Sequence, residues 1–161
     1  MVVVIIGPAG AGKTTIGRAL ATALGWRFAD GDDFHTTAAV AKMREGIPLT
    51  DTDRAPWLAS LHNLVAAAVN RREHLVLACS ALKERYRVTL RGDLSAVRFA
   101  YLKADQQTLA RRLSDRGGHF AGPALLASQL ADLEAPADAL TVDATEPPET
   151  IVGIIRNEFG L

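Results

Sequence analysis

Residues 7–14 have the composition and spacing of a phosphate-binding loop. They read GPAGAGKT, which matches the pattern G-x-x-x-x-G-K-[ST]. In such a loop the backbone N–H groups surround a phosphate, so its glycine positions exclude bulky side chains. Lys13 can reach the β- and γ-phosphates, and the Thr14 hydroxyl can ligate Mg²⁺. The alternative is a chance glycine-rich turn, but an aliphatic run before the loop and a helical pattern after it favour nucleotide binding.

A second group of reactive side chains lies at residues 30–35, which read DGDDFH. Phosphoryl transfer to a hydroxyl needs a carboxylate that orients the hydroxyl and can take its proton. Asp32 is the candidate, and Gly31 is expected to let the backbone turn so that Asp32 faces inward. The strand predicted at 75–79 ends without an acid, so Asp30 is a candidate to support the metal. The alternative is a helix N-cap cluster, in which aspartate is common.

Alternating strands and helices must position these groups. Apolar and β-branched runs predict five strands, at 2–6, 26–29, 75–79, 97–102 and 139–142. Helical patterns lie between them: after the phosphate loop to Gly25, and at 38–45, 56–70, 82–90, 105–114, 123–130 and from Pro147 onward. This order predicts an α/β fold with a parallel sheet and helices on both faces. Ligands of such sheets bind beyond the carboxyl ends of the strands, where both groups would lie.

Composition narrows the function classes. The 161 residues suit one domain over 1–161, and Cys79, the single cysteine, excludes an internal disulfide and a thiolate zinc cluster. The formal net charge is zero, which argues against a generic nucleic-acid or membrane-surface binder. The run at 2–6 is far too short to span a membrane and follows no basic segment, so we expect a cytoplasmic protein.

Although the net charge of the whole chain is zero, one segment has an excess of basic residues. Residues 71–116 hold eleven basic and five acidic side chains, whereas 117–161 hold one basic and seven acidic. A local basic block in a neutral chain suggests a small anionic ligand, although a solvated face would have the same composition.

Further segments identify a family. They are KMREGIPL at 42–49, DRAPWL at 53–58, ACSALK at 78–83, GHF at 118–120, LLASQ at 125–129 and LEAP at 133–136. Together with the phosphate loop and residues 30–35, they resemble the gluconokinase family, which are small P-loop kinases that phosphorylate D-gluconate. The resemblance covers nearly the whole chain in the right order. It implies a P-loop kinase fold and transfer of the γ-phosphate of ATP to the 6-hydroxyl of gluconate.

The resemblance also implies roles for individual residues. The catalytic residues would be Lys13, Asp32 and Arg116. ATP would be bound by Gly7, Gly10, Ala11, Gly12, Lys13, Thr14, Thr15, Arg112 and Arg116. Gluconate would be bound by Asp32, His35, Arg54, Ser80 and His119. Mg²⁺ would be held by Thr14 and, through water, by Asp30.

Several of these assignments have alternatives. Arg54 could bind a carboxylate with its planar fork, or form a surface salt bridge with Asp51 or Asp53. His35 and His119 could be structural residues. Lys83, Arg85 and Arg87 could contact the acid group of the substrate or form a solvated helix face. Cys79 is expected to be a small buried residue and not a nucleophile.

A short mobile lid is expected over about residues 111–130, where Arg112 and Arg116 would neutralise the transferring phosphoryl group. Residues 143–148 are where related folds hold the adenine. The resemblance further suggests a homodimer with no nucleic-acid or membrane partner.

Two departures from the family pattern concern the substrate. The family usually has Pro and Asn where this chain has Thr36 and Ala39. A missing hydrogen bond there would shift discrimination between polyols. A kinase for another aldonate or for shikimate is therefore one alternative function. A non-catalytic nucleotide-binding module is another, but the retained Lys13, Asp32 and Arg54 argue against it.

Overall fold

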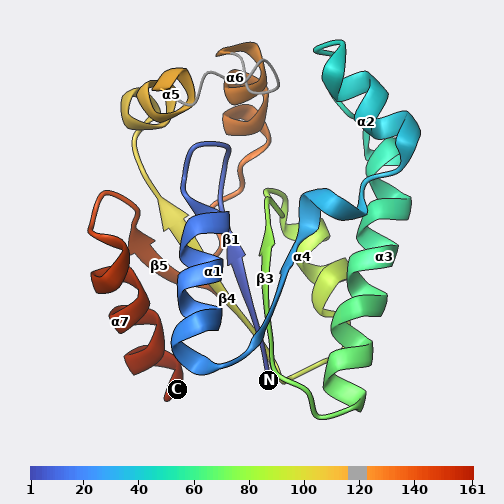
Figure 1. The fold of residues 1–161 in the computed structure, drawn as a ribbon. Helices are drawn as coiled ribbons and strands as arrows, with labels where there is room; N and C mark the ends of the chain where they lie inside the picture. The colour runs from blue at the N-terminus through green and yellow to red at the C-terminus, as the bar shows by residue number, and fades with distance from the viewer. Residues whose placement is uncertain (116–122) are drawn as a thin grey trace.

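The computed structural model contains the parallel five-stranded sheet that the sequence predicts, and it describes residues 1–115 and 123–161 (Figure 1). The strands lie in the order β2-β3-β1-β4-β5. Their bounds are Val2–Ile6 for β1, Arg27–Asp30 for β2, Leu75–Cys79 for β3, Val97–Lys103 for β4 and Leu140–Asp143 for β5. Every strand end is within one residue of its prediction.

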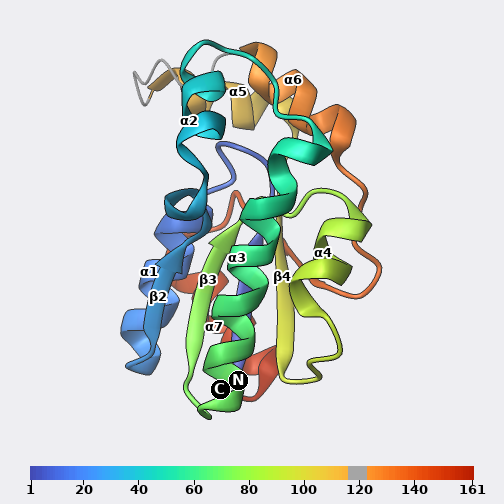
Figure 2. The ribbon, with the colours of Figure 1, turned by 90° about the vertical axis from the view of Figure 1, so that its right-hand side faces the viewer.

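Helices cover both faces of this sheet, as predicted. The helices are α1 (Lys13–Leu24), α2 (Thr37–Arg44), α3 (Asp51–Asn70), α4 (Glu84–Arg91), α5 (Gln106–Asp115), α6 (Pro123–Asp132) and α7 (Pro148–Phe159), with a 3₁₀ turn η1 at Gly31–Phe34. Helices α1 and α7 pack on one face, and α3 and α4 pack on the other (Figures 1 and 2). Within the described residues, no helix has the length and apolar character needed to cross a membrane.

The central strand β1 explains why two cores form. All five of its residues are buried. Because side chains alternate along a strand, Val2 and Val4 pack beneath α3 and α4, whereas Val3 and Ile5 pack beneath α1 and α7. The apolar run thus holds the strand rigidly between two helical layers.

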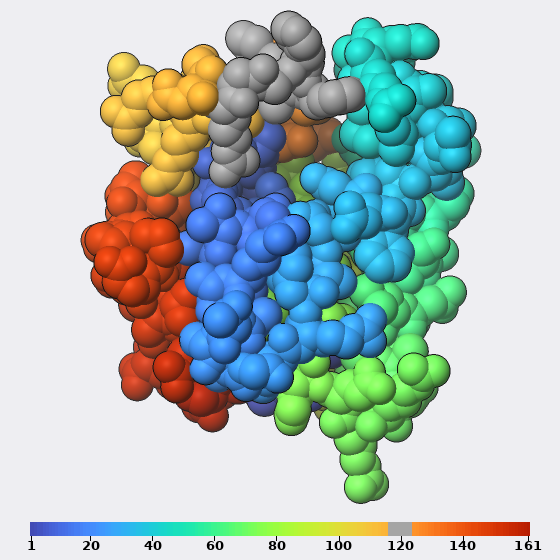
Figure 3. Space-filling model, viewed as in Figure 1, coloured from blue at the N-terminus to red at the C-terminus, as the bar shows by residue number. Residues whose placement is uncertain are grey.

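The remaining helices lie beyond the carboxyl ends of the strands. Figures 1 and 2 both show α2, α5 and α6 at this end of the molecule, whereas the two chain termini lie at the other. In the space-filling view the surface is hollowed between the phosphate loop and α2, and α6 lies at the back of the hollow (Figure 3). The fold therefore places three peripheral helices around the edge where ligands of this architecture bind.

The predicted start of α3 is wrong. The helix begins at Asp51, and Pro56 lies inside it. Thr50 and Asp53 form a capping box, in which each side chain accepts a hydrogen bond from the backbone N–H of the other. The cap brings Arg54 into the first turns of the helix.

Candidate functional site

The phosphate loop has the backbone geometry that its glycines predict. Gly7, Gly10 and Gly12 have φ values of 148°, 82° and 93°, a region that favours glycine. A Cβ on Gly10 would lie 2.8 Å from the backbone oxygen of Leu109, so this position also requires close approach. Helix α1 begins directly after the loop, and its first turn contains no acidic residue. Its positive end is therefore not neutralised from within the helix and can stabilise a bound anion.

The structure brings the two predicted metal-binding residues together. The Thr14 hydroxyl donates to Oδ2 of Asp30 at 2.8 Å, and Lys13 Nζ donates to the Pro8 carbonyl at 3.0 Å. Thr14 and Asp30 offer oxygen donors, which Mg²⁺ prefers, and this ion is commonly held by one or two protein groups together with phosphates. Among the described residues there is no cluster of three His, Cys, Asp or Glu that could hold a metal alone. The pair therefore fits an ion that arrives with a nucleotide.

Gly31 positions the acidic turn by close approach to β3. From the sequence, Gly31 is expected to supply conformational freedom, but its φ lies outside the left-handed region. Instead, a Cβ on Gly31 would lie 2.8 Å from the Ala78 oxygen. The Gly31 carbonyl also accepts a buried hydrogen bond of 2.7 Å from Nε1 of Trp57 on α3. The turn is thus held against the sheet from one side and tied to α3 on the other.

Replacing Gly31 with alanine is expected to destabilise the fold by about 1–3 kcal/mol, because the added methyl group would meet backbone atoms that cannot move independently. The matched control is Gly153→Ala in α7, where the added Cβ meets no described atom within 4 Å. That control should gain about 0.5–1 kcal/mol from helix propensity. Urea unfolding of both variants measures the two effects, and equal stabilities would contradict this account of Gly31.

Asp32 lies in the 3₁₀ turn η1, and His35 directly follows that turn. The Asp32 side chain is 76% exposed, and its Oδ1 lies 4.0 Å from Nε2 of His35, whose side chain is only 7% exposed. The His35 ring stacks on Trp57 with a centroid separation of 4.6 Å. Burial lowers the pKa of His35, opposed by the charge of Asp32. The structure therefore places a buried, stacked imidazole beside an accessible carboxylate, and burial favours the neutral form of the ring.

Arg54 pairs with a residue that the sequence did not suggest. Its Nη1 lies 3.2 Å from Oδ2 of Asp132 at the end of α6 and 3.0 Å from the Tyr86 hydroxyl. Neither Asp51 nor Asp53, the two expected alternatives, is its partner. Asp53 instead binds Lys42, whose hydrogen bonds are the main reason that the pKa of Asp53 falls to about 2.

The basic residues left open by the sequence, Lys83, Arg85 and Arg87, are all engaged by groups of the protein itself. Lys83 Nζ lies 3.0 Å from Asp132 and 3.5 Å from Asp51, and Asp51 also binds Arg85. Arg87 is buried, and it donates to the carbonyls of residues 81 and 82. It is therefore neither a solvated residue nor exposed to a substrate.

The residues that follow β3 lie next to the phosphate loop. The backbone N–H of Gly7 donates to the Ser80 carbonyl at 3.4 Å. Cys79 is buried as predicted, and burial raises its pKa to about 12, which disfavours the thiolate that a nucleophilic cysteine needs. Of the proposed lid arginines, Arg112 donates to the Ala144 carbonyl at 2.8 Å, so it reaches the segment after β5. Arg116 and His119 lie outside the described residues.

Two α6 residues at the site were not among the predicted site residues. Gln129 Oε1 accepts a hydrogen bond of 2.6 Å from the backbone N–H of Ala9 in the phosphate loop. Asp132, three residues later, binds Arg54 and Lys83. The only signal for Gln129 was its place in the LLASQ segment, because contacts 120 residues apart leave no local pattern.

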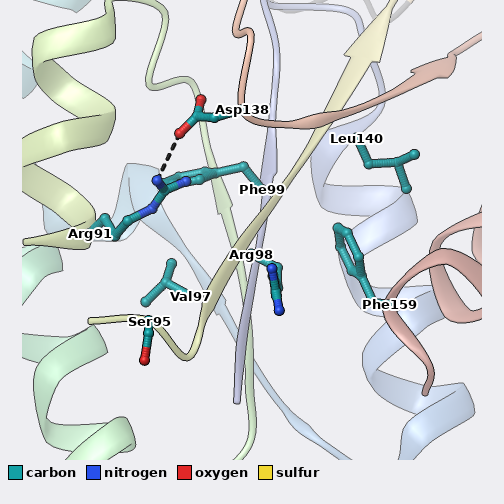
Figure 4. Close-up of a pocket in the computed structure, with 8 residues that line it drawn as sticks. All are labelled: Arg91, Ser95, Val97, Arg98, Phe99, Asp138, Leu140 and Phe159. Atoms are coloured by element: carbon teal, nitrogen blue, oxygen red, sulfur yellow. Dashed lines mark ion pairs between the residues drawn. The ribbon is translucent and has the colours of Figure 1, made fainter. Parts of the chain in front are cut away.

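A separate cavity of about 320 Å³ lies at the amino ends of β4 and β5, away from the strand ends just described (Figure 4). Its Arg91 is engaged by Asp138 at 2.7 Å and lies over the Phe99 ring. The cavity is therefore not part of the candidate site at the carboxyl ends of the strands.

Comparisons with known proteins agree with this arrangement. Residues 2–139 match the family described as AAA domain. The chain is 45% identical to a gluconokinase of Gluconobacter oxydans (strain 621H) over 97% of this chain and 89% of that protein. The solved structure of a sugar kinase from Janibacter sp. HTCC2649 superposes with a TM-score of 0.92 at 40% identity, covering 99% of this chain and 94% of that one. A gluconokinase from Sinorhizobium meliloti 1021 superposes with a TM-score of 0.83 at 40% identity, covering 94% and 86%.

Proposed function

The chain belongs to the gluconokinase family, and from that premise we propose that it transfers the γ-phosphoryl group of ATP to the 6-hydroxyl of D-gluconate. The observation that carries the proposal is a grouping at one edge of the sheet. It consists of the phosphate loop, the oxygen donors of Thr14 and Asp30, and the exposed carboxylate of Asp32. Asp30 connects these parts, because it accepts from Thr14 on the loop side and from the Asp32 backbone N–H on the acceptor side.

In the proposed reaction the 6-hydroxyl oxygen bonds to the γ-phosphorus, while the bond from that phosphorus to the β–γ bridging oxygen breaks and ADP leaves. Asp32 orients the hydroxyl and accepts its proton. Lys13 and the N–H groups of the loop stabilise charge on the phosphates. Thr14 and, through water, Asp30 would hold Mg²⁺, an ion that would supply positive charge beside the phosphates. Arg112, with Arg116, is assigned to the ATP side.

On the acceptor side, Arg54 is proposed to bind the carboxylate of the sugar acid, and His35, Ser80 and His119 its hydroxyls. A planar guanidinium matches a carboxylate in two parallel hydrogen bonds. The two departures from the family also have a structural context. Thr36 caps α2 by accepting from the Ala39 N–H at 3.2 Å, and Ala39 is buried, with 2% of its surface exposed. The oxygen of Thr36 is thus engaged in the helix cap.

A coupled ADP-release assay tests the function directly. With ATP and Mg²⁺, gluconate is expected to give the highest kcat/KM in a panel of aldonates, shikimate and uncharged sugars. A hydrogen bond to a substrate hydroxyl contributes about 0.5–1.5 kcal/mol, so aldonates that differ at one hydroxyl should be about two- to tenfold poorer. A better aldonate or shikimate would point to the alternative substrate that Thr36 and Ala39 suggest. If none of these acids is turned over, the result would favour a non-catalytic nucleotide-binding module.

We propose further that Mg²⁺ is the required ion and that the protein is a cytoplasmic homodimer. The Thr14–Asp30 pair supports the first proposal. The family resemblance supports the homodimer and the mobile lid over about residues 111–130. Of that segment, the structure describes residues 111–115 at the end of α5 and residues 123–130 of α6.

A further inference from the structure

Helix α6 contacts both halves of the candidate site with side chains on one of its faces. Gln129 accepts from the phosphate-loop N–H of Ala9 at 2.6 Å. Asp132 lies 3.2 Å from Arg54 and 3.0 Å from Lys83. Residues three apart lie on the same side of a helix. The ten-residue helix α6 therefore connects the phosphate loop to Arg54 and Lys83.

Each contact resembles one that a substrate would make. The N–H groups of a phosphate loop bind phosphate oxygens, and here the N–H of Ala9, directly before the ATP-assigned Gly10, is bound by an amide oxygen. Arg54 is assigned to the substrate carboxylate, and here it is bound by the carboxylate of Asp132. The Asp132 and Arg54 side chains are 25% and 16% exposed, so their attraction is less screened than that of a fully exposed pair.

We propose that Gln129 and Asp132 are positioning residues that act as internal stand-ins for the nucleotide phosphate and the sugar-acid carboxylate. When either substrate binds, it displaces its stand-in and loosens the hold of α6 on the other half of the site. ATP and the acid then bind cooperatively, because the second substrate has to displace an α6 contact that binding of the first substrate has already weakened. The acid half of this inference rests on the proposed function, whereas the nucleotide half needs only the phosphate loop.

The coupling follows from the rigidity of a short helix. The Gln129 and Asp132 contacts lie on the same segment, so losing one weakens the constraint that maintains the other. Thermodynamic linkage then requires the effect to be reciprocal: the factor by which the nucleotide tightens acid binding equals the factor by which the acid tightens nucleotide binding. A coupling of about fivefold lies at the lower end of typical values.

Isothermal titration calorimetry of the full chain with Mg²⁺ and the non-hydrolysable analogue AMPPNP tests the proposal. In the wild type, saturating AMPPNP should lower the Kd of gluconate about fivefold or more. Asp132→Asn should bind gluconate about three- to tenfold more tightly without nucleotide, because a charged competitor is removed. Gln129→Ala should likewise bind AMPPNP about threefold more tightly. In both variants the coupling factor should fall towards one.

The decisive measurement uses no sugar acid. Asp132→Asn should tighten AMPPNP binding, although residue 132 lies on the acceptor side. Asp138→Asn is the matched control, because Asp138 pairs with Arg91 at the other end of the sheet and should leave both affinities unchanged. If gluconate does not bind the wild type, the proposed function fails, and this AMPPNP comparison still decides the inference. Weaker or unchanged AMPPNP binding by Asp132→Asn and Gln129→Ala, with folding verified by circular dichroism, overturns it.

Discussion

Replacing Asp32 with asparagine is expected to lower kcat for gluconate phosphorylation by about 10²- to 10⁴-fold, the usual contribution of a positioned general base. Asparagine has nearly the same shape and can still hydrogen-bond to the substrate hydroxyl, but it cannot accept the hydroxyl proton. The KM for ATP should change little, because the proposed nucleotide contacts come from the phosphate loop. The loss should therefore appear in kcat at saturating concentrations of both substrates.

The surroundings of Asp32 make this substitution easy to interpret. The side chain is largely exposed, so an amide there should not disturb packing. The His35 ring is held by stacking on Trp57, which does not depend on the Asp32 charge. Asp33→Asn is the matched control, because it removes the same charge from the next residue of the same turn. If both variants lost activity equally, the local field and not a specific carboxylate would be responsible. If Asp32→Asn kept wild-type kcat, the assigned base would be wrong.

Most of the fold could be predicted because its signals are local. The five-residue aliphatic run of β1 predicts a strand buried on both faces, and the strand lies at the centre of the sheet. Gly25 predicts a helix end, and it adopts a left-handed φ of 66° there. Asp105 predicts a cap, and its Oδ1 accepts from the Thr108 N–H at 2.8 Å. In each case the residue type restricts the backbone within a few positions.

Pro56 shows how two local signals can compete. Proline is favoured in the first turn of a helix, where its missing N–H costs nothing, and this preference placed the predicted start of α3 too late. The Thr50 and Asp53 pair had the spacing of a capping box and determined the actual start. A long helix with a well-buried face tolerates one missing backbone hydrogen bond. Its buried residues include Trp57, Leu61 and Val65.

The side-chain pairing of the site could not be predicted in the same way. The sequence identified the loop, Asp30, Asp32 and Arg54, because each lies in a short recognisable segment. The contact from Arg54 to Asp132 joins residues 78 apart, and that from Ala9 to Gln129 joins residues 120 apart. Such pairs are decided by how helices pack at the end of the sheet, and no periodicity in the chain reports that packing. Arg87 is hard to predict for a different reason: its partners lie only five and six residues away, but they are backbone carbonyls, which no residue type marks.

Replacing Lys13 with alanine is the other substitution with a large expected effect. We expect kcat/KM for ATP to fall by about 10²- to 10³-fold, comparable to the loss of one positioned donor at a developing negative charge. Lys13 begins α1, so its ammonium group and the positive end of the helix act on the same phosphates. Steady-state kinetics with ATP varied at saturating gluconate measures the loss.

Stability should change much less than activity, which separates this effect from misfolding. A cation in the first turn of a helix is disfavoured by the helix dipole, at about 0.3–1 kcal/mol. Lys13→Ala removes this cost together with the hydrogen bond from Nζ to the Pro8 carbonyl, which is of similar size, so the Tm of the ligand-free protein should change little. Arg18→Gln is the matched control, because it removes a positive charge from the same helix at an exposed position over the Phe28 ring and should keep wild-type kinetics. A Lys13→Ala variant that lost activity and Tm together would indicate that this lysine supports the fold, whereas retained kcat/KM would remove it from the catalytic machinery.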